Sequence, residues 1–343
     1  MKPVALLIND LHISKDNILE FEKNWDEALS VCKQYCIEKI FVGGDVFTTR
    51  NVQHLMPVKT VMRCLDKAHL QGIETTIAFG NHDCPIYGEK DSWCDILAFI
   101  PGVTIINDFT VIDFTGSDKV LALIAYFPEE TMMVDKLKEL DEYLEEHKIS
   151  ASDTNLYIHS GVHGALGDFD VPNEMPQEPL LKYNHVLCAH YHNRTIIKDT
   201  NIEYIGSSRA HTFGEDEEKG YTLLYADGSI AFVKNEVNTR YVTEDVTLDS
   251  LSDWKNTYDQ RYKIRLKIHC TAAEADTVDK DDLFSRGVNK IEFVTEKLQA
   301  IESSQIEMEE KFDNKNLKVE YKAFCNEKDI DSRFGIDYLN KIK

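Results

Sequence analysis

Five short clusters of metal-binding residue types follow one another along the first two-thirds of this chain. They are Asp10-Leu11-His12, Gly43-Gly44-Asp45, Gly80-Asn81-His82-Asp83, His159 and His190-Tyr191-His192. Imidazole, carboxylate and amide groups are ligands of divalent cations in proteins. Two such cations about 3.5 to 4 Å apart, bridged by a carboxylate, can catalyse the hydrolysis of phosphate esters. A single Asp-x-His or His-x-His pattern is common by chance, but the ordered set predicts a two-metal phosphoesterase centre.

Each cluster directly follows an apolar run that is typical of a buried strand, at residues 4–8, 40–42, 73–79, 156–158 and 186–189. The spacing of apolar residues also indicates helices over 17–36 and 54–70. In such an α/β core, ligands collect at the carboxyl ends of the strands. We therefore expect the clusters to converge on one edge of a sheet. The alternative is that they are five unrelated loop beginnings.

Composition limits the class of protein. The 343 residues, of which 43% are hydrophobic, suffice for one large domain and a smaller one. No signal segment and no apolar run near 18 residues is present, so we expect a cytoplasmic protein without a membrane span. The eight cysteines form no CxxC pair and are expected to be reduced. The net charge of −22 is unusual for a protein that binds a polyanion unaided, so bound cations or a partner would supply positive charge.

The pattern of strands and helices divides the chain into three parts. Residues 1–235 form the main domain, in which further strands are expected at 103–106, 110–114 and 120–125, a charged helix at about 130–147, and short strands at 195–198, 202–205, 221–225 and 230–233. We expect the last group to complete a second sheet beneath the catalytic loops. A polar connector is predicted at 236–253.

Residues 254–343 are expected to form a small α+β domain. In residues 262–269 apolar and basic side chains alternate, so one face of this strand should be buried and the other should carry Lys263, Arg265 and Lys267. A long amphipathic helix is predicted at 289–311 and a strand at 317–324. This domain could guide DNA, dock on a partner, or only pack on its own strands.

The five clusters resemble those of the calcineurin-like metallophosphoesterases over residues 4–233. More narrowly, the segment 205–221, with its Gly206-Ser207 loop, Phe213, acidic run and Lys219-Gly220, resembles the nuclease subunit of double-strand-break repair complexes, the SbcD-like proteins and the corresponding phage recombination endonuclease subunit. The resemblance implies an α+β fold, a four-layer α/β/β/α metallophosphoesterase sandwich with a small C-terminal α+β capping domain.

The resemblance also implies a ligand set for two Mn²⁺ ions, although Mg²⁺ or another divalent ion would suit the same donors. The first ion would be held by Asp10, His12, Asp45 and His192. The second would be held by Asp45, Asn81, His159 and His190, so that Asp45 bridges. His82 would stabilise the transition state and protonate the leaving 3′ oxygen.

Other residues of the clusters have less certain roles by the same comparison. Where the superfamily often has an Asp or His that orients the catalytic histidine, this chain has Thr48. Asp83 could orient His82 instead, or support the loop. Thr48 also argues against the protein phosphatase branch, which has Asp-Arg-Gly after the bridging Asp. Three arginines follow the clusters or lie in the Gly-Ser loop, and each could bind a DNA phosphate: Arg50, Arg194 and Arg209.

The resemblance implies a Mn²⁺-dependent DNA exonuclease and endonuclease subunit for recombination and double-strand-break repair. Its expected partners are DNA and an SMC-like ABC ATPase (SbcC-like), with a possible homodimer, in the cytoplasm of a bacterium or a phage-infected host. A phosphoesterase that acts on a small phosphate ester or a phosphoprotein is an alternative. A weakly catalytic scaffold for the ATPase is another.

Overall fold

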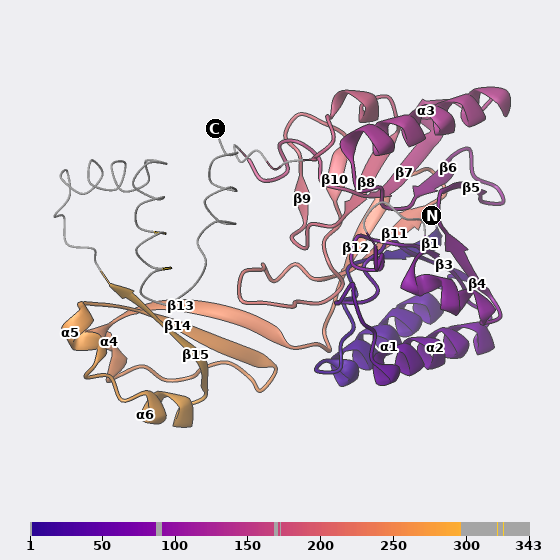
Figure 1. Ribbon diagram of the computed structural model, residues 1–343. Coiled ribbons are helices and arrows are strands. Elements are labelled where there is room, and N and C mark those ends of the chain that lie inside the picture. Colours follow the sequence, from indigo (N-terminus) through magenta and orange to yellow (C-terminus); the bar gives the residue numbers. More distant parts are fainter. Residues whose placement is uncertain are drawn as a thin grey trace. The chain divides into compact units, whose positions relative to one another are not determined.

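The computed structural model describes residues 2–86, 91–167, 171, 173–295, 321 and 325. The chain divides into two compact units. The first contains Met1–Glu244, Asn256–Arg265 and Arg286–Lys290, and the second contains Asp245–Lys255, Leu266–Ser285 and Ile291–Lys343. Two six-stranded mixed sheets and several helices make up the first unit (Figure 1).

The first sheet has the strand order β12-β11-β1-β2-β3-β4. Its strands are β1 Pro3–Ile8, β2 Lys39–Val42, β3 Glu74–Ala78, β4 Val103–Ile106, β11 Gly220–Tyr225 and β12 Ile230–Lys234. Strands β1 to β4 are parallel, and Ile8, Val42 and Ile77 lie in register across β1, β2 and β3. Because these strand ends are level, the loops that follow them begin side by side.

The second sheet has the order β5-β6-β7-β8-β10-β9. Its strands are β5 Phe109–Asp113, β6 Val120–Ile124, β7 Thr154–His159, β8 His185–Ala189, β9 Thr195–Ile196 and β10 Ile202–Tyr204. Strands β6, β7, β8 and β10 are parallel, and His159 at the end of β7 is in register with Ala189 at the end of β8. The register therefore places His159 level with the start of the His190 cluster.

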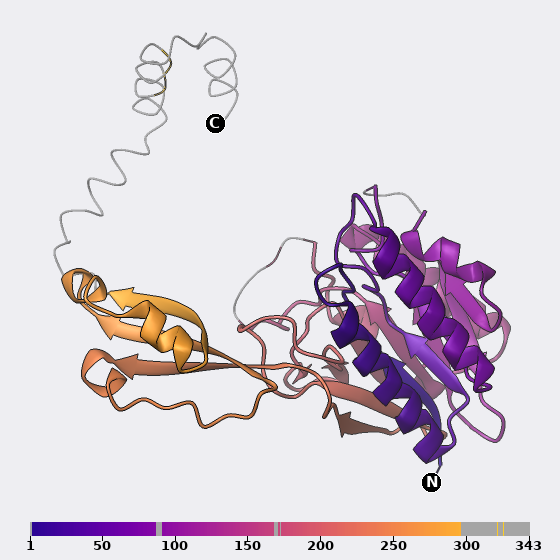
Figure 2. The ribbon, with the colours of Figure 1, turned by 90° about the horizontal axis from the view of Figure 1, so that it is seen from below.

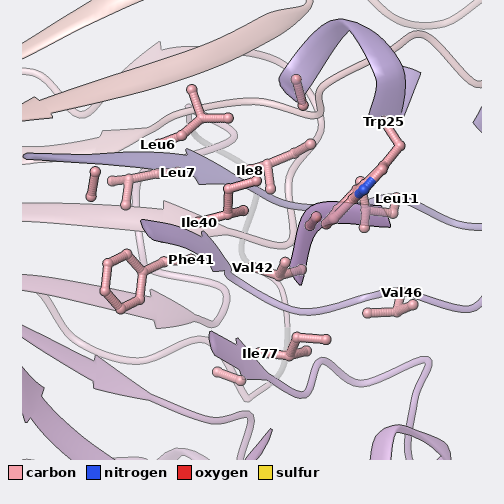
Figure 3. Packing of buried hydrophobic residues seen from close by; sticks show 14 of the residues in the cluster. Leu6, Leu7, Ile8, Leu11, Trp25, Ile40, Phe41, Val42, Val46 and Ile77 are labelled. Atoms are coloured by element: carbon pink, nitrogen blue, oxygen red, sulfur yellow. The ribbon is translucent and has the colours of Figure 1, made fainter. Parts of the chain in front are cut away.

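Helices cover the outer faces of the two sheets. Helices α1 (Ile18–Tyr35) and α2 (Leu55–Leu70) pack on the first sheet. In the core between these helices and the sheet, Trp25 of α1 lies beside Leu11 (Figure 3). Helix α3 (Glu130–Glu146) packs on the second sheet. Along β6, Leu121 and Leu123 belong to the core shared with the first sheet, whereas alternate residues belong to the core under α3. The layers therefore run helix, sheet, sheet, helix, an arrangement compatible with the expected α+β sandwich.

The helices predicted at 17–36, 54–70 and 130–147 are confirmed within two residues at each end. Two expectations about the sheets are wrong. The strands at 221–225 and 230–233 join the first sheet instead of the second, because β11 pairs with β1. The ligand clusters also follow strands of both sheets and not of one. No helix in the described part of the chain is long and apolar enough to cross a membrane.

A three-stranded sheet, drawn in orange tones in Figure 2, contributes residues to both units. Its order is β13-β14-β15, with β13 Arg240–Thr247, β14 Tyr262–Cys270 and β15 Val288–Thr295. The predicted alternation in β14 is confirmed, because Ile264, Leu266 and Ile268 are buried and the basic residues between them are not. The short helices of this part are α4 Leu248–Leu251, α5 Ala272–Ala275 and α6 Lys280–Ser285.

Two of the expected segments differ from the structure, and a third lies almost wholly outside the described residues. The expected connector at 236–253 contains β13 and α4. The first residues of the expected helix at 289–311 belong to β15, where pairing with β14 prevails over the helical spacing; its remainder, from residue 296, lies outside the described residues. The expected strand at 317–324 also lies outside them except for Tyr321, which is helical. The described part of the chain also contains three short 3-10 helices: η1 Trp93–Phe99, η2 Ala151–Asp153 and η3 Glu178–Leu180.

Candidate metal centre

The structure brings the five clusters together at the carboxyl ends of β1, β2, β3, β7 and β8. Ligand atoms within each of three groups lie within 4.8 Å of one another: Asp10, His12 and His192 form the first set, Asp45, His159 and His190 form the second, and His82 forms a third group with His12 and Asp45. Six of the seven expected ligands are among these residues, and Asn81 contacts the second set through His159 and His190. Side chains from positions 10 and 192 thus share one buried site.

Asp45 lies between the two sets. Its Oδ2 is 3.5 Å from Nε2 of His12, and its Oδ1 is 3.5 Å from Nε2 of His159. The carboxylate is 2% exposed, and Oδ1 also accepts a 2.8 Å hydrogen bond from the main-chain N–H of His82. One oxygen of Asp45 therefore faces each set, which is the arrangement that a bridging carboxylate requires.

The first set contains a buried acceptor atom without a donor in the described part of the chain. Nε2 of His12 lies 3.1 Å from Nε2 of His192, whose Nδ1 is 3.0 Å from Glu215 Oε1. Since Glu215 can only accept when ionised, Nδ1 carries the proton, and a neutral His192 has its lone pair on Nε2. Asp10 is fully buried, and its Oδ1 has no hydrogen-bond partner among the described residues. A cation would satisfy these atoms, so the residues present fit a divalent ion.

The second set has the same character. Nδ1 of His159 lies 2.8 Å from the Gly43 carbonyl oxygen, which fixes a proton on Nδ1 and directs Nε2 toward Asp45. The Asn81 Oδ1 lies 3.0 Å from this Nε2 and 2.9 Å from Nδ1 of His190. Hydrogen bonds of this kind, from a ligating imidazole to a carbonyl or carboxylate, orient metal ligands in known metal sites.

The charges at the site favour cations. Burial lowers the pKa of His12 and of His190 to about 4, so both imidazoles are neutral and free to coordinate at neutral pH. Burial alone would also lower the pKa of His159, but the Asp45 carboxylate raises it to about 9. Burial would raise the pKa of Asp45, but the neighbouring histidines, His159 first, hold it well below its usual range. The potential around Asp45 therefore attracts positive charge, and a dication can replace the proton on His159.

The backbone is strained where the ligands lie. Asp10, His12, Asp45 and His190 have positive φ values of 51°, 43°, 54° and 95°. Such conformations are uncommon for residues other than glycine and occur often at functional sites. Gly80 allows its backbone to lie close to the Asp45 carboxylate, because a Cβ at position 80 would lie 2.2 Å from Asp45 Oδ1. These unusual backbone conformations thus direct the ligand side chains toward the metal site.

His82 lies beside the metal ligands and has a clear orienting partner. Its ring centroid is 4.9 Å from that of His12, and its Nδ1 lies 2.7 Å from the main-chain carbonyl oxygen of Thr48. The Thr48 hydroxyl is used elsewhere, in a 2.7 Å hydrogen bond to the carbonyl oxygen of His12. Thr48 therefore occupies the orienting position through its backbone, which a search for an acidic or imidazole side chain could not find.

Asp83 supports the loops and does not contact His82. Its carboxylate accepts hydrogen bonds from the main-chain N–H groups of Val46, Phe47 and Gly80, at 3.2, 2.9 and 2.9 Å. These bonds tie the loop after β2 to the loop after β3. Burial, followed by the nearby Asp45, raises the pKa of Asp83 to about 7. Of the two roles expected for Asp83, these contacts favour support of the loop.

Three residues next to the ligands were missed by sequence reasoning. His211 lines the cleft, its Nε2 lies 2.8 Å from the Asp10 carbonyl oxygen, and its ring is 5.0 Å from that of His192. Glu215 contacts Nδ1 of His192, and the fully buried Lys219 lies 3.3 Å from Glu215 and donates a 2.6 Å hydrogen bond to the His192 carbonyl. The available signal was the acidic run followed by a lysine in the segment 205–221.

The three arginines expected at DNA differ from one another. Arg194 is engaged internally, because it donates a 2.6 Å hydrogen bond to Glu203 and packs over the Phe232 ring. Arg209 is 3% exposed and donates to the carbonyl oxygens of Leu11 and His12. Both guanidinium groups are therefore held by internal hydrogen bonds, contrary to expectation, although Arg209 also lines the cleft over the ligands. Arg50 is exposed, and although its carbonyl oxygen accepts a bond from the Trp93 indole, its guanidinium makes no hydrogen bond or ion pair to the described residues, so it remains a candidate for phosphate contact.

A cleft of about 550 Å³ opens over the first set of ligands. Its lining includes His12, His82, His192 and His211, and it extends to Tyr241 and Lys263. In comparisons with known proteins, no family model matches this chain, and no curated protein matches it.

Proposed function

We propose that this chain is a Mn²⁺-dependent phosphodiesterase that cleaves DNA, with the metallophosphoesterase fold and the nuclease-subunit role that its sequence clusters resemble. The position of Asp45 supports the proposal most strongly. Its two carboxylate oxygens face two sets of potential metal ligands, which come from the ends of five strands. Asp10, His12, Asp45 and His192 would hold one ion. Asp45, Asn81, His159 and His190 would hold the other. Bound ions would supply the Lewis acidity that activates water and neutralises charge on the phosphoryl oxygens.

The chain's own residues supply the remaining chemistry. Because the Thr48 carbonyl only accepts, Nδ1 of His82 carries a proton and Nε2 is left for the substrate. An imidazolium at this position can donate its Nε2 proton to the leaving oxygen of a phosphodiester. The main-chain N–H of His82 bonds to Asp45, which fixes the distance between this acid and the ligands. The hydrogen bonds that Nδ1 of His159 and Nδ1 of His192 donate to the Gly43 carbonyl and to Glu215 hold these ligand imidazoles in one tautomer.

DNA is the preferred substrate class because of the sequence resemblance and the exposed Arg50 near the ligands. The net charge of −22 opposes unaided binding of a long polyanion at physiological salt. We therefore propose that an SMC-like ABC ATPase partner strengthens DNA cleavage. A homodimer is compatible with the same role.

The test compares two substrates. Purified full-length chain should hydrolyse linear duplex DNA and bis(p-nitrophenyl) phosphate with Mn²⁺, and a chelator should abolish both reactions. Hydrolysis of the small ester without any cleavage of DNA, with or without an added ATPase partner, would favour the small-ester alternative. Failure to hydrolyse either would favour the scaffold.

A further inference from the structure

A second cavity, of about 220 Å³, shares His190 with the cleft over the metal ligands. Its lining includes Arg50, Tyr126, Phe127, Ser160, Glu174 and Tyr191. Typical pockets for drug-sized ligands have roughly 300–1,000 Å³, so this one suits a single ring system. His190 thus separates a place for a phosphate from a place for a small planar group.

Glu174 is the unusual residue of this cavity. It is 2% exposed, its Oε1 accepts a hydrogen bond from the Tyr191 hydroxyl, and its Oε2 is buried with no hydrogen-bond partner among the described residues. A buried acceptor without a partner costs free energy, and native structures contain few of them. Gly161 sets its position, because a Cβ at residue 161 would lie 2.9 Å from Cγ of Glu174. A donor on a bound ligand would satisfy Oε2.

The rest of the lining suits a nucleotide. Three aromatic residues, Tyr126, Phe127 and Tyr191, line the cavity, and aromatic side chains bind nucleobases by stacking. Arg50 is exposed, and its carbonyl oxygen accepts a 2.6 Å hydrogen bond from the Trp93 indole, which anchors the loop that carries it. A guanidinium binds phosphate, and a glutamate accepts from the exocyclic amine of cytosine. The aromatic residues, the buried Glu174 carboxylate and the exposed Arg50 guanidinium therefore line one cavity beside the metal-ligand residue His190.

We propose that this cavity binds the base of the nucleotide whose phosphate lies at the metal centre, and that Glu174 favours a base with an exocyclic amino group. This inference rests on the proposed nuclease function. Cytosine presents an amine donor where thymine presents a carbonyl acceptor. The O4 carbonyl of thymine would face the Glu174 carboxylate, and neither group can donate a hydrogen bond. Thymine should therefore bind more weakly than cytosine. Arg50 would contact the phosphate and should not discriminate between bases.

The test measures binding of deoxycytidine and thymidine monophosphates, as 5′ and 3′ esters, to the full chain with Mn²⁺ by calorimetry. The cytidine nucleotide should bind at least about fivefold more tightly. Glu174→Gln should remove this preference, because an amide can serve either base. Arg50→Ala should weaken both nucleotides by a similar factor. Glu178→Gln, a change at an exposed carboxylate in the same segment, should retain the preference.

Gly161→Ala gives a second variant, in which the added methyl group displaces Glu174 and should also reduce the preference. Equal affinity of the wild-type chain for both nucleotides, or a preference that Glu174→Gln retains, would overturn the inference. Hydrolysis of bis(p-nitrophenyl) phosphate and DNA by the same wild-type sample separates the two proposals. Cleavage of DNA with no base preference refutes only the cavity's role, whereas absence of both cleavage and nucleotide binding refutes the nuclease function as well.

Discussion

The imidazole of His82 lies 2.7 Å, through Nδ1, from the main-chain carbonyl oxygen of Thr48. This contact determines which nitrogen of His82 is left for a substrate. Any residue at position 48 can supply the carbonyl, so the orienting function does not depend on the threonine side chain. The side chain instead bonds to the carbonyl oxygen of His12 and steadies the loop after β1.

His82→Ala should lower kcat on DNA by about 10² to 10⁴-fold, the range typical of a general acid, because the leaving oxygen loses its proton donor. Metal content should remain near that of the wild type, since the ligand side chains stay in place. Steady-state kinetics and elemental analysis on the same sample measure both effects. Loss of bound metal in this variant would instead make His82 a ligand.

Thr48→Val is the matched comparison for His82→Ala. The variant keeps the carbonyl that orients His82 and loses the hydroxyl bonds to the carbonyl oxygens of His12 and Ile13. We expect less than a tenfold fall in kcat. A loss as large as that of His82→Ala would show that the hydroxyl itself takes part in the reaction.

Asp45→Asn and Asp83→Asn should impair different properties, the first metal binding and the second thermal stability. A neutral amide at position 45 cannot bridge two dications, so this variant should lose bound metal and activity. Asp83→Asn replaces a carboxylate that accepts three main-chain N–H bonds, so it should mainly lower the melting temperature. Metal analysis and thermal unfolding, run on both variants, test the difference. Equal metal loss in the two would mean that the bridge is misassigned.

Much of the site could be predicted from the sequence because the ligands follow strands, and short-range patterns locate strand ends. The Thr48 carbonyl could not be predicted, because a backbone contact leaves no residue-type signal. The internal hydrogen bonds of Arg194 and Arg209, to Glu203 and to the carbonyl of Leu11, depend on how the chain folds and leave no local sequence pattern. Strand β15 was read as a helix because its spacing fits both structures, and only its partner β14 decides between them.

Lys219→Met should destabilise the fold by about 3–5 kcal/mol, because it leaves the buried Glu215 without its cation. The variant should also bind Mn²⁺ more weakly at the first site, where Glu215 orients His192. Urea unfolding and metal titration measure these effects. Lys138→Met removes an exposed pair with Asp135 and should change stability by no more than about 1 kcal/mol. Similar losses in the two variants would contradict the role of Lys219.

Glu20 should make stability depend on pH in the acid range. Burial would raise its pKa, but hydrogen bonds from the Thr239 N–H and Asn238 lower it to about 2. The stabilisation is therefore complete above the unfolded-state pKa of about 4.5 and is lost as pH falls toward 2. Glu20→Gln should be less stable than the wild type at pH 6, and this difference should disappear near pH 2. A control change at the exposed Glu142 should show no such trend, and a constant difference for Glu20→Gln would contradict the argument.

Anomalous diffraction from crystals soaked in Mn²⁺ tests the central claim most directly. We expect two manganese peaks on either side of the Asp45 carboxylate, about 3.5 to 4 Å apart. One peak should be bounded by His12 and His192, and the other by His159 and His190. A single peak, or manganese bound only away from Asp45, would contradict the two-metal centre.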